Sequence, residues 1–378
     1  ILIPNIFNHP FTYIDKNKKL KIGNFVKVEF GSSLVTGVVW NFFEEKNKNF
    51  KIKPVLKVLE VPKMKKSMMN FINWFSTYNV VPLGMALRLV LLNKEVVEKL
   101  KDNSFDQFNS FELSKKFSLN DEQKKCLEQI SKEKTKFNVH VIEGVTGSGK
   151  TLVYFSRIKE LIDKGYQALI MLPEISLTSQ FHKRFLEFFS FEPAIWHSGI
   201  TKKNKKIIWR GVVENKIKAV VGARSSLFLP FNKLGIIIVD EEHDSSYKQD
   251  EGVMYNARDM AVSRASFEKI PINLVTSIPS IETFNNIKKK KYNVSILKKR
   301  YKNAALPKLE IIDLNLKKIV ANNWISPETI KKVSEHLEKG DQVLFFLNRR
   351  GFAPFVICKN CHLKFFCPNC SVNLNYHK

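Results

Sequence analysis

The 378-residue sequence lacks any long uninterrupted hydrophobic stretch. Its longest apolar segment, Leu83 to Leu92, is interrupted by Arg88 and is much shorter than the about 20 residues that a membrane-spanning helix needs. No basic segment followed by an apolar one opens the chain, so nothing indicates export, and we expect a cytoplasmic protein with no membrane partner. Hydrophobic residues still make up 44% of the chain, which excludes general disorder.

Acidic residues are also scarce. The chain has 36 Asp and Glu against 62 Lys and Arg, which gives a formal net charge of +26. The surplus is spread along the chain, so no single basic arm carries it. It favours a polyanionic partner, and nucleic acid is the simplest one. A biased coding sequence that enriches Lys, Asn, Ile and Phe would give the same composition, so the motifs must decide.

Cysteine is rare, and four of the five cysteines lie close together near residue 360. They form two Cys-x-x-Cys pairs, Cys358 with Cys361 and Cys367 with Cys370. In a cytosolic protein such pairs bind Zn²⁺ as thiolates instead of forming disulfides. Only five residues separate the two pairs, whereas pairs that share one zinc ion are commonly roughly 15–20 residues apart. We therefore expect each pair to need another pair beyond residue 378.

The first part of the chain predicts β structure followed by helices. Phe25–Phe30 alternates between apolar and polar residues, Gly31–Ser33 makes a turn, and Leu34–Trp40 follows as a second strand. From Lys65 to Leu100 apolar residues recur every three or four positions, which predicts helix. Residues 101–118 are polar and are interpreted as a linker.

From Leu119 onward, helical segments alternate with short apolar strands, which predicts a parallel sheet covered by helices on both faces. The predicted strands are Val139–Glu143, Ala168–Leu172, Lys218–Val221, Ile236–Val239 and Ile272–Val275. Further on, Pro327–Lys339 is expected to be a helix capped by Ser326, and Val343–Leu347 a new strand. The fold class is therefore α/β.

One segment between a predicted strand and a predicted helix matches the phosphate-binding loop pattern G-x-x-x-x-G-K-[ST]. Its backbone N–H groups can surround phosphates, Lys150 can reach the β- and γ-phosphates, and Thr151 can offer its hydroxyl to Mg²⁺. The predicted nucleotide-binding residues are Gly144, Val145, Thr146, Gly147, Ser148, Gly149, Lys150 and Thr151.

An acidic motif completes such a site. The apolar strand Ile236–Val239 runs directly into Asp240 and Glu241, and ligands of open α/β sheets bind at the carboxyl ends of strands. Asp240 is expected to hold Mg²⁺, and Glu241 to orient and deprotonate the attacking water. Lys150, Thr151, Asp240 and Glu241 are thus the predicted catalytic residues, with ATP and Mg²⁺ as cofactors.

Three further segments carry hydroxyl, basic or aromatic residues of the kinds that contact nucleic acid. Two of them leave predicted strands, at 172–178 and 222–226, and the third is the loop that follows the acidic motif. The candidate DNA contacts in them are Thr178, Arg224, Tyr247, Lys248 and Arg258. For the third loop, ordinary surface polarity with a packed tyrosine is an equally good interpretation of the residue types.

Together these motifs resemble the PriA family, the bacterial primosomal replication-restart DNA helicases of superfamily 2. The resemblance rests on the strings GVTGSGKT, LPEISLT, HSG, GARSSLFLPF, VDEEHDSSYKQ, YNARD and FLNRRGFAP, followed by the paired cysteines. It implies an ATP-dependent 3′→5′ helicase that recognises stalled or forked DNA and initiates primosome assembly. The implied partners are forked and single-stranded DNA, other primosome proteins, the single-stranded DNA-binding protein and the replicative helicase loading system.

The resemblance also implies a domain organisation. Residues 119–313 would form the first RecA-like helicase lobe, with Gln123 at the position that reads adenine. Residues 326–357 would begin the second lobe, and residues 358–378 would belong to a zinc-binding insertion that holds half of each of two interleaved zinc sites.

Residues 1–100 resemble the domain of the family that holds the 3′ end of the leading strand. Phe11, Thr12, Gly31 and Lys53 fall at its pocket positions. The family commonly has Asp where Thr12 stands, and an uncharged side chain makes a weaker hydrogen bond to the 3′-hydroxyl.

The sequence departs from the family pattern in three ways, and the first two favour a second hypothesis. The 101–118 linker has no room for a winged helix. Ile278 replaces the Thr of a Ser-Ala-Thr-Pro motif, so we expect ATP hydrolysis to survive while unwinding is impaired. The sequence also stops before the rest of the second lobe, so we expect it to bind nucleotide and DNA but to turn ATP over poorly. The alternative function is a fork-binding primosome-assembly scaffold with weak or uncoupled ATPase, which the intact phosphate loop opposes.

Overall fold

The computed structural model divides the chain into two compact units, residues 1–305 and 306–378, and each is described by itself. The structure describes residues 1–16, 18–43, 52–92, 97, 100, 102–108, 117–132, 136–173, 179–300, 308–313, 325–346, 358, 360–361, 363–366 and 368.

A small antiparallel sheet opens the first unit, as the alternating sequence predicts. Its strands β1 (Phe25–Phe30), β2 (Ser33–Val38) and β3 (Lys57–Val58) lie in the order β2-β1-β3. Gly31 has a φ of 59°, which allows the tight turn that pairs Phe30 with Ser33. Val26 and Val28, two residues apart on β1, point into one small buried cluster.

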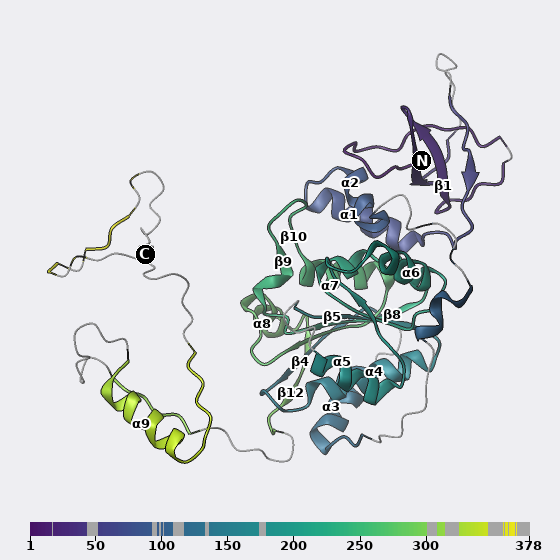
Figure 1. Ribbon diagram of the computed structural model, residues 1–378. Coiled ribbons are helices and arrows are strands. Elements are labelled where there is room, and N and C mark those ends of the chain that lie inside the picture. Colours follow the sequence, from purple (N-terminus) through teal and green to yellow (C-terminus); the bar gives the residue numbers. More distant parts are fainter. Residues whose placement is uncertain are drawn as a thin grey trace. The chain divides into compact units, whose positions relative to one another are not determined.

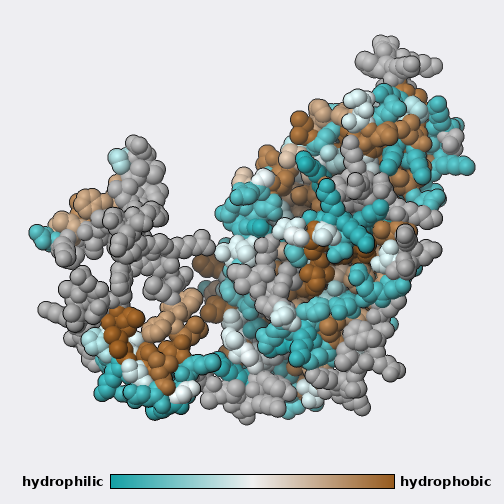
Figure 2. Space-filling model, viewed as in Figure 1, coloured by the Kyte–Doolittle hydropathy of each residue, from teal (hydrophilic) through white to brown (hydrophobic). Residues whose placement is uncertain are grey.

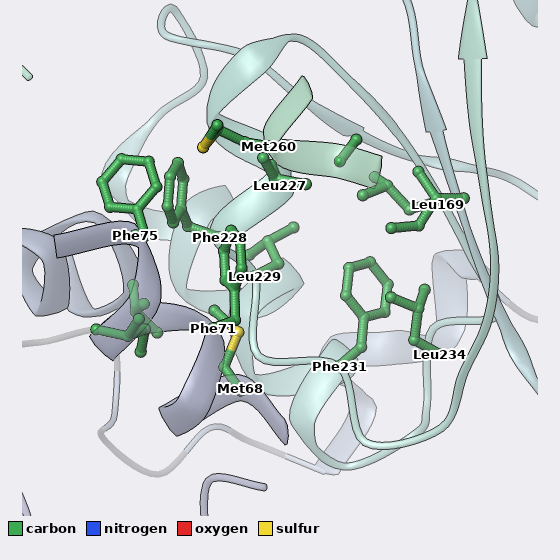
Figure 3. Close-up of a cluster of buried hydrophobic side chains, with 14 of the residues drawn as sticks. Met68, Phe71, Phe75, Leu169, Leu227, Phe228, Leu229, Phe231, Leu234 and Met260 are labelled. Carbon is green, nitrogen blue, oxygen red and sulfur yellow. The ribbon is translucent and has the colours of Figure 1, made fainter. Parts of the chain in front are cut away.

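Two amphipathic helices follow, α1 (Lys66–Tyr78) and α2 (Leu83–Leu91). Figure 3 shows Phe71 and Phe75 of α1 packed against Phe228, with ring centroids 6.1 and 5.1 Å apart. Tyr255 completes this aromatic cluster at 5.6 Å from Phe75, and Trp209 Nε1 donates to the carbonyl of Val90 in α2. One continuous hydrophobic core therefore joins the N-terminal helices to the following lobe.

The lobe is built on a seven-stranded sheet in which all neighbouring strands are parallel, which confirms the predicted α/β class. Its strands are β4 (Val139–Gly144), β5 (Gln167–Met171), β6 (Ala194–Trp196), β7 (Ala219–Gly222), β8 (Leu234–Asp240), β11 (Ile272–Thr276) and β12 (Asn293–Leu297). Their order is β12-β4-β11-β8-β5-β7-β6, so β11 lies between the strand that enters the phosphate loop and the strand that ends in Asp240.

Helices cover both faces of this sheet (Figure 1). One face is packed by α3 (Asp121–Ser131), α4 (Lys150–Ile162) and α5 (Ser179–Phe189), and the other by α6 (Lys202–Val213) and α7 (Ala257–Glu268). In β8, Ile236 and Ile238 are buried on the first face, whereas Ile237 and Val239 are buried on the second. The strand reads as continuously apolar because both of its sides are buried.

Short elements connect the main ones. They are η1 (Asp102–Phe108), η3 (Arg224–Phe228), η4 (Ser245–Tyr247), the paired strands β9 (Lys248–Gln249) and β10 (Tyr255–Asn256), and α8 (Ile281–Lys288). The helical turn η1 lies inside the segment predicted to be a linker. The strands β9 and β10 form a hairpin directly after the acidic motif.

Hydrophilic residues cover much of the visible described surface of the first unit, with smaller hydrophobic areas between them (Figure 2). None of the helices within the described ranges combines the length and the apolar composition that crossing a bilayer requires.

In the second unit, the described residues contain the predicted helix α9 (Pro327–Glu338), whose cap Ser326 accepts a hydrogen bond from the Thr329 N–H at 3.1 Å. The strand expected from Val343 is not formed over residues 343–346. No described strand lies alongside this segment to supply the hydrogen bonds of a β ladder.

Candidate nucleotide-binding site

The phosphate loop lies where the sequence predicts it, between the last residue of β4, Gly144, and the first residue of α4, Lys150. Gly147 and Gly149 have φ values of 83° and 81°, which residues with a side chain rarely adopt. A Cβ atom on Gly149 would lie 2.3 Å from Nε2 of Gln123, whereas one on Gly147 would meet open space. Gly149 is thus required both by its backbone conformation and by the lack of room.

Two side chains of the loop have hydrogen-bonding capacity that a phosphate could use. Lys150 Nζ donates to the carbonyl of Gly144 at 2.7 Å. Burial lowers the pKa of Lys150, and the nearby carboxylates of Glu241 and Asp240 partly oppose that effect. Ser148 Oγ is buried and has no hydrogen-bond partner. An unpaired buried hydroxyl beside a lysine and a helix N-terminus fits phosphate oxygens.

The buried carboxylate at the end of β8 belongs to Asp240. Tyr154, on α4, donates its hydroxyl to Oδ2 at 2.9 Å, and the Glu241 N–H donates to Oδ1 at 3.0 Å. Burial raises the pKa of Asp240 to about 6, although the hydrogen bond from Tyr154 lowers it. Glu241 has a φ of 48°, and its partly exposed carboxylate lies 3.7 Å from His243 Nδ1.

The sheet brings these two motifs to one edge. Along β11, Thr276 pairs with Glu143 of β4 and Val275 pairs with Asp240 of β8, so the ends of all three strands are level. The Tyr154–Asp240 hydrogen bond ties the loop helix to the acidic strand directly. The Asp240 carboxylate and the Thr151 hydroxyl are oxygen donors of the kind that Mg²⁺ prefers, so the residues present fit a magnesium-bound nucleotide.

Gln123 supports the loop from α3. Its side chain is fully buried, and Nε2 donates to the carbonyl of Ser148 at 2.9 Å. Its Oε1 accepts the N–H of Asn120 at 2.9 Å in a capping box at the start of α3. Both ends of the amide therefore have protein partners, and adenine recognition by Gln123 stays a prediction.

The residue after Glu241 has a place in the structure that the sequence did not indicate. Glu242 is buried, and it accepts hydrogen bonds from the Ser280 N–H at 2.7 Å, the Ser280 hydroxyl at 3.0 Å and the Thr283 hydroxyl at 2.9 Å. Arg258 Nη1 donates to it at 3.2 Å. Three adjacent acidic residues signal a site, but residue type alone cannot say which of them points inward.

The adjoining His243 contacts the segment that carries Ile278. Thr276 Oγ1 donates to the carbonyl of Ile278 at 2.7 Å and lies 2.8 Å from His243 Nδ1. A hydroxyl has one hydrogen, so His243 Nδ1 must be the donor in this pair. The contact uses the Thr276 hydroxyl and the backbone of Ile278, whose side chain is 72% exposed. The impaired unwinding expected from Ile278 stays a prediction.

Two predicted DNA contacts are buried residues in this structure. The Tyr247 hydroxyl lies within hydrogen-bond distance of two carbonyls, those of Asp240 at 2.6 Å and Met171 at 3.0 Å, and donates its one hydrogen to them. Arg258 is held by Glu242 and by Asp259, the latter at 2.8 Å. A DNA contact by either side chain would require these bonds to break, so we do not include the two residues in the proposed DNA surface.

Two other predicted contacts remain accessible. Arg224 Nη1 donates to the carbonyl of Lys248 at 2.7 Å, and the exposed Lys248 Nζ lies 3.2 Å from Asp250. Lys248 is therefore part of the β9–β10 hairpin, and Arg224 lies beside it. Thr178 lies outside the described residues.

The N-terminal pocket positions also come together. The rings of Phe11 and Phe30 lie 4.9 Å apart, with Thr12 exposed beside them. Lys53 Nζ donates to the carbonyl of Gly31 at 3.4 Å and lies 3.2 Å from the Glu29 carboxylate. An aromatic ring, a lysine and an exposed turn thus share one end of the small sheet.

The zinc prediction concerns residues that are only partly described. Cys367 and Cys370 lie outside the described residues, and within the described part of the chain no three His, Cys, Asp or Glu side chains are grouped to hold a metal. The backbone N–H groups of Cys361 and Asn360 lower the pKa of the Cys358 thiol, which favours the thiolate that zinc requires.

Family models match two parts of the chain. Residues 1–92 match the 3′ DNA-binding domain (3′BD), and residues 116–277 match the type III restriction enzyme, res subunit. The replication restart protein PriA of Rickettsia conorii is 42% identical over 383 residues, which cover all of this chain and 58% of that protein. PriA of Bacillus subtilis is 36% identical over 291 residues, which cover 76% of this chain and 36% of that protein.

Among solved structures, the UvsW helicase of bacteriophage T4 aligns with a TM-score of 0.36 and 17% sequence identity. The alignment covers 53% of this chain and 68% of that one, and the similarity is too weak to support an assignment. The parallel sheet, the phosphate loop and the carboxylates at its edge define a RecA-like P-loop lobe. With the sequence matches, they show that the chain belongs to the PriA family of replication restart proteins. It spans 58% of the length of its Rickettsia conorii relative.

Proposed function

We propose that the protein is an ATP-dependent DNA helicase that acts on forked DNA in replication restart and moves 3′→5′. The observation that carries the proposal is the position of Lys150 and Asp240 at one edge of the sheet, tied together through Tyr154 on the loop helix. Membership of the PriA family and the match of residues 1–92 to a 3′ DNA-binding domain support DNA as the substrate.

The residues at this edge can divide the chemistry of ATP hydrolysis among them. The loop N–H groups and the Ser148 hydroxyl bind phosphate oxygens, and Lys150 exchanges the Gly144 carbonyl for the β- and γ-phosphates. Asp240 and Thr151 hold Mg²⁺, which when bound neutralises charge on those phosphates. Glu241, partly exposed beside the buried Asp240, orients the attacking water and accepts its proton.

The DNA-facing part of the proposal uses two surfaces. The N-terminal pocket of Phe11, Thr12, Gly31 and Lys53 receives a 3′ end, and the β9–β10 hairpin with Arg224 and Lys248 contacts the strand during hydrolysis. The single-stranded DNA-binding protein, other primosome proteins and the helicase loading system are proposed as partners by family resemblance. We also propose that the protein binds two zinc ions, each held by one cysteine pair and by residues beyond 378. A cytoplasmic location belongs to the same proposal.

The deciding experiment compares the wild-type protein, in the full length that its gene encodes, with Lys150→Ala. A helicase should hydrolyse ATP faster when forked DNA is added and should displace a strand, and Lys150→Ala should lose both activities. Lys159→Ala is a matched control, because Lys159 lies on the same helix, is exposed and pairs only weakly with Asp163 at 3.9 Å. If the wild type assembles partner proteins at forks but displaces no strand, and Lys150→Ala does the same, the scaffold function replaces this proposal.

A further inference from the structure

The buried carboxylate of Glu242 connects three parts of the lobe. It lies in the chain directly after Glu241, and its side chain is 0% exposed. Its four hydrogen bonds come from the residue before α8, from within α8, and from Arg258 at the start of α7. A buried charge is stable only when it is paired and hydrogen-bonded in this way, so these contacts hold one another in place.

The contacts with α8 fix the first turn of that helix. Ser280 is the N-cap residue, and its hydroxyl both accepts from the Thr283 N–H at 3.3 Å and donates to Glu242. A carboxylate beside a helix N-terminus is also favoured by the helix dipole. Any displacement of the Asp240–Glu242 segment would therefore have to move the first turn of α8 with it or break these bonds.

The contact with Arg258 leads toward the hairpin. Arg258 is the second residue after β10, and it also donates to the Ser280 hydroxyl at 2.7 Å, so it links the hairpin, the Glu242 carboxylate and α8. Lys248, at the start of the other hairpin strand, is one of the accessible candidate DNA contacts. One path from this hairpin to the nucleotide edge therefore passes through the buried Arg258–Glu242 ion pair, beside the direct contact of Tyr247 with the Asp240 carbonyl.

We propose that Glu242 is a positioning residue that, through Arg258 and the first turn of α8, makes ATP hydrolysis depend on DNA bound at the β9–β10 hairpin. This inference rests on the proposed function. It assigns Glu242 no contact with ATP or with water. A purely structural carboxylate would stabilise the lobe equally well but would leave the response to DNA unchanged.

A second buried carboxylate in the chain, that of Glu268, serves as a matched control that separates a positioning role from a purely structural one. Glu268 lies at the far end of α7, its side chain is 1% exposed, and it too is held by a basic residue and a hydroxyl, Lys65 at 3.3 Å and Ser67 at 2.8 Å. Glu268→Gln and Glu242→Gln should both lower the melting temperature. Only Glu242→Gln should reduce the ratio of ATPase rates with and without forked DNA, by about tenfold, within the usual range of coupling between sites.

Thr283 supplies a second pair of variants in case Glu242→Gln folds poorly. Thr283→Val has the same shape but no hydroxyl to donate to Glu242, whereas Thr283→Ser keeps the hydroxyl. Thr283→Val should reduce the ratio of ATPase rates with and without forked DNA, whereas Thr283→Ser should keep this ratio close to that of the wild type. Two results would overturn the proposal. The first is that Glu242→Gln and Glu268→Gln reduce the ratio of ATPase rates with and without forked DNA equally. The second is that neither Glu242→Gln nor Thr283→Val changes this ratio.

Hydrogen exchange on the present chain separates a failure of this inference from a failure of the proposed function. A non-hydrolysable ATP analogue with Mg²⁺ should slow exchange across residues 276–288 in the wild type and in Glu268→Gln, but not in Glu242→Gln. If the analogue binds and leaves this segment unchanged in the wild type, the inference is wrong while the nucleotide site stands. If the analogue does not bind at all, the proposed function itself fails and the inference with it.

Discussion

Replacing Asp240 with Asn should stabilise the metal-free protein while abolishing its binding of magnesium nucleotide. Asp240 is partly buried, with Tyr154, Glu241, Tyr247 and Lys150 around its carboxylate and backbone. Its pKa rises from 3.8 to about 6, and at about 1.4 kcal/mol per unit of pKa the ionised carboxylate costs the native state about 3 kcal/mol. An Asn side chain avoids this cost, because its oxygen can accept from the Glu241 N–H and its amide can donate to the Tyr154 hydroxyl.

The sign of the pH dependence follows from the direction of the pKa change. The native carboxyl binds its proton more tightly than the unfolded one, so the free energy of unfolding falls as the pH rises from about 4 to about 6. Above about pH 6 the native wild type carries the full free-energy cost of the ionised Asp240 carboxylate, whereas Asp240→Asn carries none of it. The advantage of the variant should therefore be largest at pH 7 to 8 and should shrink toward pH 4.

Thermal unfolding in a buffer with EDTA measures this difference. About 3 kcal/mol corresponds to a rise in melting temperature of roughly 5 to 10 °C for a protein unit of this size. Adding ATP and Mg²⁺ should then raise the melting temperature of the wild type but not that of the variant. A variant that melts no higher than the wild type at pH 8, or by a margin that does not change with pH, would refute the reasoning.

Two further substitutions test the loop and the hairpin. Gly149→Ala should lower the free energy of unfolding by roughly 1–3 kcal/mol more than Gly147→Ala, because the strain of a positive φ is common to both positions and only Gly149 also lies against Gln123. Chemical denaturation compares the two variants directly. Tyr247→Phe should cost about 1 kcal/mol because it removes the hydrogen bond that the buried hydroxyl donates to the carbonyls of Asp240 and Met171. It should not change the affinity for forked DNA at constant salt, and a fall in that affinity would restore Tyr247 to the DNA surface.

Much of the lobe could be predicted from the sequence because its central strands are buried on both faces. A strand such as β8 is apolar along its buried stretch from Ile236 to Val239, and the phosphate loop and the acidic motif mark the strand ends. The edge strand β12 gives no such signal, since only Ser295 and Leu297 of its five residues are buried. Strand β6 has only three residues, too few to show a period.

The orientation of side chains after the acidic motif could not be predicted. Tyr247 and Arg258 have the chemistry of nucleic-acid contacts, but both point inward to satisfy buried groups. The same composition suits a DNA surface and a buried polar network, and only the path of the backbone distinguishes them. For this reason Asp240 and Glu241 could be proposed as catalytic residues from the sequence, whereas Glu242 could be assigned no role.

The aromatic cluster of Phe75, Phe228 and Tyr255 has a practical consequence for anyone who wishes to shorten this protein. A version that began at Leu119 would lose α1 and α2 and would leave Phe228 and Trp209 facing water. Such exposed rings promote aggregation, so the motor lobe is expected to be insoluble without its neighbour. One hydrophobic core therefore crosses the boundary between the two family matches, and we expect a cut at that boundary to destabilise both parts.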